Sequence, residues 1–456
     1  MRAAAAHVVR SRLERNLLRE TEGASNAYYG LIAFLVAIIA WGLYAFLTQF
    51  VFGLATTGMG DRVVWGFYIV NFVFFLGIAM AGTVISAVLR ITGAGWRTPI
   101  TRIAELVTVT ALMIGAIMPV IDLGRPDRVA SILTYGRFQS AIMWDIIVIT
   151  TYLVGSLIYF YLPLIPDLAI MRDRLAQSGE SFKRWVFTLM AVGWQDTSEQ
   201  RERLEKGSRI MSLAIIPMAV MTHTVASLIF AWMLRPGWNS TIYGVYFVIG
   251  AVFSGIGTVI IVMVVLRKFC HLEEYLTEKH FRNLSYMLLA LLLAYFYLVI
   301  TEYLTVGYTL VTEEKHLLEI VLLGSNAIWF WGFVIFGLLV PGFLLVFRRG
   351  RAIPRIVAAS VLVNIAMWIK RFIIVVPSQQ VPLLPYEFAT YTASWVEWSI
   401  TAAAVAAFVL AFAVAAKVIP LVPIWEMAEE AEESAEPPPA RISEFPERSY
   451  SIWERR

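Results

Sequence analysis

The fold is decided by long apolar stretches, of which the clearest is residues 63–89, VVWGFYIVNFVFFLGIAMAGTVISAVL. This stretch carries no charged residue, and it exceeds the about 20 residues that a helix needs to cross the hydrocarbon core of a bilayer. Inside a bilayer no water is present to bind the backbone, so a spanning segment must satisfy its own hydrogen bonds. The stretch therefore predicts a transmembrane helix.

Nine further stretches of the 456-residue chain share this character, and 59% of all residues are hydrophobic. Only 15% are charged, whereas soluble domains carry about 25%. We therefore predict an all-α integral membrane protein with about ten transmembrane helices, a multi-pass protein of the cell (inner) membrane. The predicted spans are 28–51, 63–89, 103–121, 140–164, 210–234, 243–266, 284–306, 318–346, 352–376 and 394–423.

The Lys and Arg residues of the connections predict the orientation, because they are enriched on the cytoplasmic side. With a cytoplasmic N-terminus, 29 of the 37 Lys and Arg residues fall on that side and six fall outside. Both termini are therefore predicted to be cytoplasmic. The transmembrane domain, 28–424, is flanked by a basic segment at 1–27 and by an acidic, Pro-rich tail at 425–456. The composition of the tail predicts disorder.

The connection 165–209 is long and basic. We interpret it as an interfacial amphipathic segment on anionic lipid, with docking to a cytoplasmic partner as the alternative.

Composition also limits the cofactors that the chain itself can hold. Cys270 is the one cysteine, which excludes an intrachain disulfide and an iron–sulfur ligand set. No CxxCH motif is present, which excludes the usual attachment of c-type haem. His223 is the only histidine inside a predicted span, so a six-coordinate b-type haem lacks a second axial histidine. We predict no metal, haem or cluster in this chain and no nucleic-acid partner.

Ionisable residues cluster near the predicted outer face, although charge inside a bilayer is costly and usually faces a cavity. A loop with alternating charges follows the third span, and its plain structural interpretation is local ion pairing. A purely structural role for His223 would be that of a neutral, hydrogen-bonded histidine. For Lys370 and Arg371 the structural alternative is that their charged groups extend (snorkel) to the membrane interface. The clustered residues are Asp122, Arg125, Asp127, Arg128, Asp145, His223, Glu302, Lys370 and Arg371.

Two acids, a histidine and two cations at similar depth on four spans suit two-proton chemistry on a hydrophobic ligand. Histidine and carboxylate groups are the usual bases for such chemistry, and a mainly apolar pocket with a few convergent polar groups is the expected site. A lipid-soluble quinol fits this description. In the inner half, Glu105, Asn71, Thr108 and Asn364 are open to two interpretations, a water-lined route or packing hydrogen bonds.

Several of these segments resemble the NrfD-like family, the membrane subunits of the polysulfide reductase type. The resemblance covers residues 60–310 and rests on Trp65–Phe74, Ala81–Ala87, Asp122-Leu-Gly-Arg-Pro126, Trp144-Asp145, His223–Ser227 and Gly237–Tyr243. It implies two four-helix bundles, about 63–234 and 243–376, with two peripheral helices. This chain has Met80 and Asp122 where the alternative complex III branch carries histidines, which suggests a proton-accepting role for Asp122.

The resemblance also implies a function. Family members bind menaquinone or ubiquinone and exchange electrons with an outer-face iron–sulfur subunit; a multihaem cytochrome c or a molybdopterin subunit is a further possible partner. We therefore expect the quinone-reactive subunit of a multi-subunit respiratory oxidoreductase, inactive alone, with proton release or uptake near the outer face.

The site residues follow from the pattern and the resemblance together. His223 and Asp145 are expected to accept the protons of a quinol bound in the first bundle, and Asp122 to pass them outward. Arg125 is expected to fix the loop and keep the acids ionised. The predicted quinone-binding residues are Arg125, Thr83, Trp144, Ser227, Glu302 and Arg371.

Two alternatives of other classes remain at this point. A secondary transporter with an outward-facing polar cavity is disfavoured, because Pro119, Pro217 and Pro341 lie at or toward helix ends rather than at matching mid-membrane positions. A purely structural anchor predicts that neutralising the inner acids leaves turnover intact. The sequence does not identify the quinone or the direction of electron flow.

Overall fold

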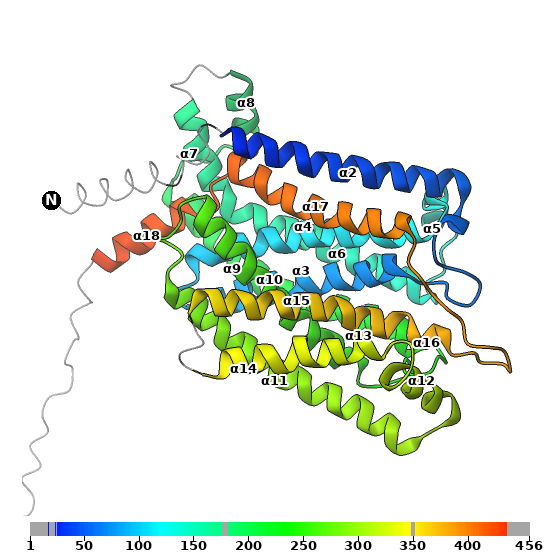
Figure 1. Ribbon diagram of the computed structural model, residues 1–456. Coiled ribbons are helices and arrows are strands. Elements are labelled where there is room, and N and C mark those ends of the chain that lie inside the picture. Colours follow the sequence, from blue (N-terminus) through cyan, green and yellow to red (C-terminus); the bar gives the residue numbers. More distant parts are fainter. Residues whose placement is uncertain (1–16, 18–22, 24, 176–180, 348–351, 436–456) are drawn as a thin grey trace, which may run out of the picture.

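The computed structural model describes Leu17, Gly23 and residues 25–175, 181–347 and 352–435. Within them lie ten helices long and apolar enough to span a membrane, arranged side by side (Figure 1), and no strand. The prediction of an all-α, multi-pass membrane protein is confirmed. The spanning helices are α2 (Asn26–Phe52), α3 (Phe67–Ile91), α4 (Thr98–Asp122), α6 (Ala141–Tyr161), α9 (Ser198–Ala231), α10 (Tyr243–Phe269), α11 (Glu278–Thr309), the segment Ala327–Val346, α15 (Ile353–Val375) and α17 (Trp395–Val418).

Shorter helices lie at the two ends of this array. One end, on the left in Figure 1, carries α7 (Ile165–Leu175), α8 (Ser181–Met190) and α18 (Ile424–Ala435). We name it the inner end, following the predicted orientation. The opposite, outer end carries α5 (Ala130–Tyr135), α12 (Thr312–Leu322) and α16 (Pro377–Gln380). We call α3, α4, α6 and α9 the first bundle, and α10, α11, the segment Ala327–Val346 and α15 the second bundle.

Helix α3 lies at the centre and is buried along most of its length. Glycines allow its neighbours to approach closely, as is typical of helix packing in membranes. A Cβ atom on Gly82 would lie 2.1 Å from the carbonyl oxygen of Ala104 in α4, and one on Gly255 of α10 would lie 2.3 Å from Cβ of Ala81. Helix α3 therefore joins the two bundles through α10.

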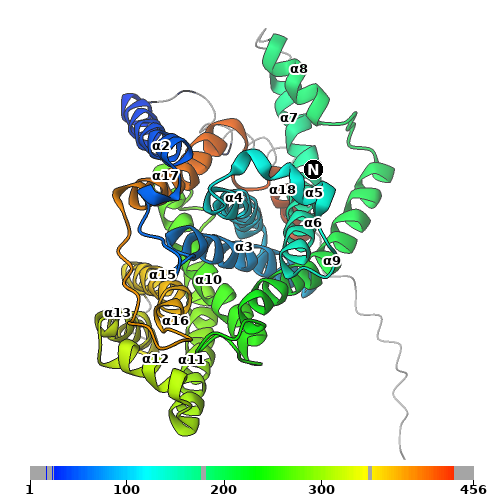
Figure 2. The same ribbon diagram turned by 90° about the vertical axis from the view of Figure 1, so that its right-hand side faces the viewer.

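Helices α2 and α17 pair with each other at one side of the array (Figure 2), where a Cβ atom on Gly42 would lie 2.2 Å from Cβ of Ala403. The buried side chain of Glu397 ties α17 to the neighbouring loops. It accepts hydrogen bonds from the hydroxyl of Tyr391 at 2.5 Å and from the backbone N–H of Gly58 at 2.7 Å.

Helix boundaries differ from the predictions where local polar groups determine them. The predicted span 210–234 begins earlier, at Ser198, because Thr197 and Gln200 form a capping box. The predicted span 318–346 consists of α12 followed by α13 (Ala327–Gly332), a π-helix at Phe333–Leu339 and α14 (Val340–Val346).

The prediction of a disordered tail is wrong for residues 425–435, which belong to α18 (Ile424–Ala435). Its composition is acidic, but Glu426 is buried against Arg90 and Arg97 at the inner ends of α3 and α4. One of the acidic residues that favour disorder in an isolated segment is thus paired with arginines distant in sequence. Residues 436–456 lie outside the described part of the chain, as does most of segment 1–27.

Candidate functional site

The outer end of the second bundle contains a cavity of about 460 Å³ between α10, α11, α12 and α15. This volume lies within the range of small-molecule sites. Its polar wall contains Glu302 and Tyr303 of α11 together with Lys370 of α15. The Nζ atom of Lys370 donates hydrogen bonds to Oε2 of Glu302 at 3.1 Å and to the hydroxyl of Tyr303 at 3.3 Å.

Lys370 is completely buried. An ammonium group at such a position is costly unless it is paired and hydrogen-bonded. Besides Glu302, aromatic rings surround it, with Nζ 4.9 Å from the ring centroid of Tyr303 and 5.3 Å from that of Tyr246. The negative faces of these rings stabilise a cation further. The cavity therefore has a fixed positive group directly beside a carboxylate.

The remaining wall of the cavity is mainly apolar and comes from α11, α12 and α15. Its residues include Val306, Leu317, Leu318, Val321, Ile373 and Ile374. Such a lining suits a ligand with a polar head and an apolar body. The loop before α10 closes another side with the backbone and side chains of residues 239–241.

Arg371 follows Lys370 in the sequence but points elsewhere, and it does not line this cavity. Its guanidinium group lies over the ring of Phe247 at 5.6 Å and against Gly250 of α10. The side chain is buried, and its Nε and Nη1 atoms have no hydrogen-bond partner. Arg371 thus occupies the helix interface between the cavity and α3.

In the first bundle, Asp145 lies in the second turn of α6 and is 7% exposed. Its Oδ1 atom is buried without a hydrogen-bond partner. The neighbouring Trp144 points outward, where its ring meets Trp232 edge-on and its indole N–H donates to the carbonyl of Phe138. Asp145 is therefore a buried acid that retains free hydrogen-bonding capacity.

His223 connects α9 to α3. Its Nδ1 atom lies 2.8 Å from the carbonyl oxygen of Ala219, and its Nε2 atom lies 2.8 Å from that of Leu76. A neutral imidazole carries one N–H and can donate to only one of these oxygens, whereas an imidazolium can donate to both. The ring is buried and fixed between two backbones.

Two predicted quinone ligands of the first bundle also use their hydroxyl groups within the protein. Ser227 donates to the carbonyl of Thr224 at 2.7 Å. Thr83 lies 2.7 Å from the hydroxyl of Tyr152 and 3.2 Å from that of Thr108. Thr83 therefore belongs to a hydroxyl cluster shared by α3, α4 and α6.

Asp122 is the last residue of α4 and lies on a third side of the molecule. The preceding Ile121 packs against Tyr68 and Val396, and its carbonyl accepts a hydrogen bond from Gln49 of α2. The Oδ1 atom of Asp122 is buried and has no hydrogen-bond partner. This residue is therefore placed among α2, α3, α4 and α17.

Arg125 lies in the exposed loop after α4 and pairs with Asp127 through two hydrogen bonds of 3.0 and 2.9 Å. These hydrogen bonds lower the pKa of the Asp127 carboxyl. The loop ion pair considered from the sequence is thus present. The partner of Arg125 is Asp127 rather than one of the buried acids.

Apart from Arg125 in the exposed loop and Arg371 at the helix interface, the predicted site residues occupy three neighbourhoods. Asp145 and His223 lie in the first bundle, Asp122 lies beside α17, and Glu302 lines the second-bundle cavity. Sequence reasoning noticed Lys370 but did not include it, or Tyr303, among the ligand-binding residues. The signal in the sequence that could have indicated this site is a lysine, Lys370, inside one predicted span and a tyrosine, Tyr303, inside another.

Among the described residues, no group of three or more His, Cys, Asp or Glu side chains is placed to hold a metal ion. The acids and histidines described above are distributed over separate helices. The polar side chains that line the cavity include the carboxylates of Glu302 and Glu314, the ammonium group of Lys370, and hydroxyl groups of Ser, Thr and Tyr residues.

Together, the ten apolar helices long enough to span a membrane define a multi-pass membrane protein, and the cavity at one end of the array is its candidate ligand site. Residues 55–383 match the family described as polysulphide reductase, NrfD. The chain therefore belongs to this family, as the resemblance implied.

Three relatives are similar to the chain. One, from Halobacterium salinarum, carries the provisional name of a dimethyl sulfoxide reductase membrane subunit and is 29% identical over 54% of this chain. That match spans 52% of the relative, about half its length. The Hdr-like menaquinol oxidoreductase integral membrane subunit of Archaeoglobus fulgidus is 24% identical over 91% of this chain and 99% of its own. A selenate reductase subunit of Mesobacillus selenatarsenatis is 24% identical over 86% and 94%.

Proposed function

We propose that this chain is the quinone-reactive membrane subunit of an oxidoreductase complex and that the quinone head group binds in the outer-end cavity of the second bundle. The cavity is the observation that carries this proposal, because it combines space, an apolar wall and the pair Glu302–Lys370. One relative is named a menaquinol oxidoreductase subunit and two are named reductase subunits, which supports a redox complex over a transporter.

Oxidation of a quinol releases two electrons and two protons. In our proposal, the Glu302 carboxylate accepts one hydroxyl proton, breaking that O–H bond. The Lys370 ammonium stabilises the negative charge that forms on the ring oxygen. Positioned acid–base groups of this kind accelerate a reaction by about 10²–10⁴-fold. The second O–H bond breaks as its proton passes to water on the side of the cavity that Asn239 and Ser240 line.

The electrons pass to a redox centre of a partner subunit, which we propose to be an iron–sulfur subunit at the outer face. The same geometry supports the reverse reaction, in which a quinone gains two electrons and two protons. Menaquinone and ubiquinone both offer the required pair of ring oxygens.

The first bundle provides a rival position for the same function. There the sequence-derived proposal uses Asp145 and His223 as proton acceptors, with Thr83, Trp144 and Ser227 as quinone ligands. The unpartnered Oδ1 of Asp145 favours it. The hydrogen bonds that already engage His223, Thr83 and Ser227 favour the second bundle.

A photoactivatable quinone analogue distinguishes the two positions. Membranes containing the assembled complex are illuminated with the analogue, and labelled peptides are mapped by mass spectrometry. We expect label on α11, α12 and α15, displaced by excess natural quinone. Displaceable label on α6 and α9 would transfer the site to the first bundle, and label that excess quinone does not displace would reject a specific site.

A further inference from the structure

The inner end of the first bundle contains a buried charge network that the proposed function does not use. Helix α18 is fixed there by Asp167 of α7, whose carboxylate accepts the backbone N–H groups of Ile424 at 3.0 Å and Trp425 at 2.9 Å. Arg102 of α4 pairs with the same carboxylate at 2.5 Å and donates to the carbonyl of Pro420 at 3.0 Å. The start of α18 is therefore held over the ends of α4 and α7.

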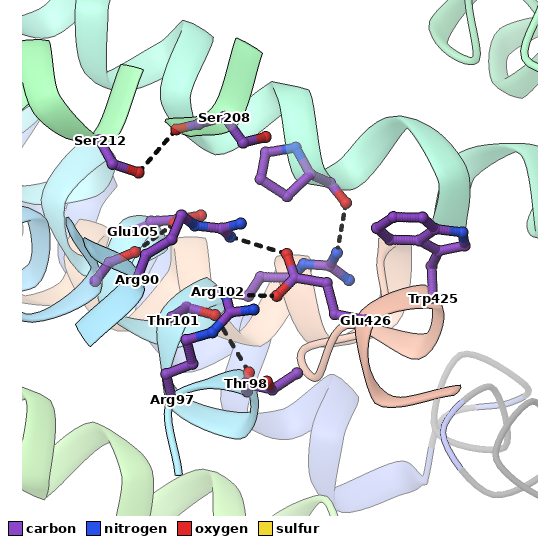
Figure 3. Close-up of polar contacts among 12 residues, drawn as sticks. Arg90, Arg97, Thr98, Thr101, Arg102, Glu105, Ser208, Ser212, Trp425 and Glu426 are labelled. Carbon is purple, nitrogen blue, oxygen red and sulfur yellow. Dashed lines mark hydrogen bonds and ion pairs between the residues drawn. The ribbon is translucent and has the colours of Figure 1, made fainter. Parts of the chain in front are cut away.

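Close to this start, Glu426 of α18 lies between two arginines (Figure 3). Its carboxylate is 2.8 Å from Nη2 of Arg90 in α3 and 3.3 Å from Nη1 of Arg97. Burial opposes ionisation of Glu426, but the two arginines outweigh it and lower its pKa. The guanidinium group of Arg90 is therefore held in an ion pair with α18 through its Nη2 atom.

Behind this contact lies Glu105 of α4, which is 3% exposed. Its Oε1 atom accepts a hydrogen bond of 2.6 Å from Ser86, whose hydroxyl is also 3.0 Å from that of Tyr159 in α6. Figure 3 shows the Arg90 side chain passing beside Glu105 on its way to Glu426. The Nε atom of Arg90 is buried and has no hydrogen-bond partner within the described part of the chain, so this N–H group is a further donor on the side chain that passes Glu105.

Several of the helices around Glu105 bring a charged or titratable side chain close to it. They are Arg90 of α3, Arg102 of α4, Tyr159 of α6 and Glu426 of α18. Helix α9 contributes the uncharged hydroxyl of Ser212, 3.3 Å from that of Tyr159. Because both nearby arginines already pair with other carboxylates, Glu105 has a hydroxyl donor but no ion-pair partner of its own among the described residues.

We propose that Glu105 is a proton-binding site whose occupancy α18 controls through Arg90. While Glu426 holds Arg90, Glu105 is unpaired and buried and keeps its proton, since burying an unpaired charge is costly. When α18 leaves, Arg90 turns to Glu105. The carboxyl O–H bond then breaks, the proton passes to water at the inner end, and the carboxylate forms an ion pair with Arg90. Docking of α18 reverses each step.

This inference does not rest on the quinone proposal, because it concerns a carboxyl group at the opposite end of the molecule. It can be tested without turnover by infrared difference spectroscopy of membranes that contain the assembled complex at neutral pH. The readout is the C=O stretching band of a protonated carboxyl group. We expect Glu105→Gln to remove one such band, and Glu105→Asp to keep a shifted band.

Whether α18 controls the protonation of Glu105 is tested by variants of the contact between Glu426 and Arg90. Glu426→Gln is expected to remove the same band, because the released Arg90 ionises Glu105. Adding Arg90→Gln to Glu426→Gln should restore it. Glu199→Gln is the matched control, since Glu199 lies at the same end but is exposed and paired with Arg203. A band that survives Glu105→Gln would overturn the proton site, and one that survives Glu426→Gln would overturn the control by α18.

Discussion

The two bundles contain similar buried polar residues but use them differently. In the second bundle, Glu302 and Lys370 pair on the wall of a cavity. In the first bundle, the ring of His223 is bound to two backbone carbonyls, and the hydroxyl of Thr83 is bound to that of Tyr152. In the proposed assignment, the difference between the bundles is that a cavity adjoins the buried polar residues of the second bundle.

The comparison is tested most strongly by Glu302→Gln, which keeps the shape of the side chain but removes the proton acceptor. We expect quinol-dependent turnover of the complex to fall by about 10²-fold or more, the usual effect of removing a general base. Glu319→Gln is the matched control, because Glu319 lies on nearby α12 but is half exposed. If Glu302→Gln turned over nearly as fast as the parent, the cavity would not be the site of the reaction.

The opposite test is Asp145→Asn in the first bundle. If the second bundle holds the quinone, turnover should fall by less than about tenfold, below the range for loss of a general base. The rate is measured on assembled complex, with assembly checked by co-purification of the partner subunits. Abolished turnover in an assembled complex would instead support the sequence-derived site of Asp145 and His223.

The contribution of the Glu302–Lys370 pair to the stability of the second bundle is tested by Lys370→Met. This change leaves Glu302 without its cation in a mostly buried position, and breaking a buried pair costs about 3–5 kcal/mol. We expect a lower melting temperature of the purified complex in detergent. The double variant Lys370→Met/Glu302→Gln should recover most of the loss, since no unpaired charge remains. Equal melting of the single variant and the parent would show that the pair is exposed to water.

The sequence predicts the fold better than it predicts the site. Ten long apolar stretches determine ten helices, because a bilayer leaves the backbone no alternative. The short helices at the ends are different, since α18 depends on Asp167 and Arg102, which are distant in sequence. Their contacts arise only when the bundle has formed.

The site illustrates the same limit. Hydropathy places Glu302, Asp145 and Asp122 at similar depth. It does not give the rotation of each helix about its axis, which decides the neighbours that each side chain faces. The rotation of α4 directs its last turn toward α2 and α17, where Ile121 packs against Tyr68. Neither this rotation nor the cavity beside Lys370 leaves a periodic signal in the sequence.

The inner end adds a prediction for acid pH, in contrast to the outer cavity. The pKa of Glu426 is lowered below its ordinary value of 4.5 because Arg90 and Arg97 outweigh the effect of burial. A group with a lowered pKa stabilises the folded state above its ordinary pKa and loses that contribution as the pH falls through the folded value. Because the intrinsic rate of amide hydrogen exchange itself falls as the pH is lowered, the quantity to compare is the protection of the α18 amides relative to that intrinsic rate. This protection should be high at neutral pH and should decrease below about pH 4.5. In Glu426→Gln it should be low at both neutral and acid pH.

The smallest expected effect belongs to the exposed loop after α4. Arg125 pairs with Asp127 rather than with a buried acid, and both side chains are largely exposed. Exposed pairs contribute little because solvent and salt screen them. Arg125→Gln should therefore leave the melting temperature and the turnover of the complex near the parent values. A large loss of turnover with an unchanged melting temperature would show that Arg125 contacts quinone or a partner protein, as its sequence-derived assignment proposes.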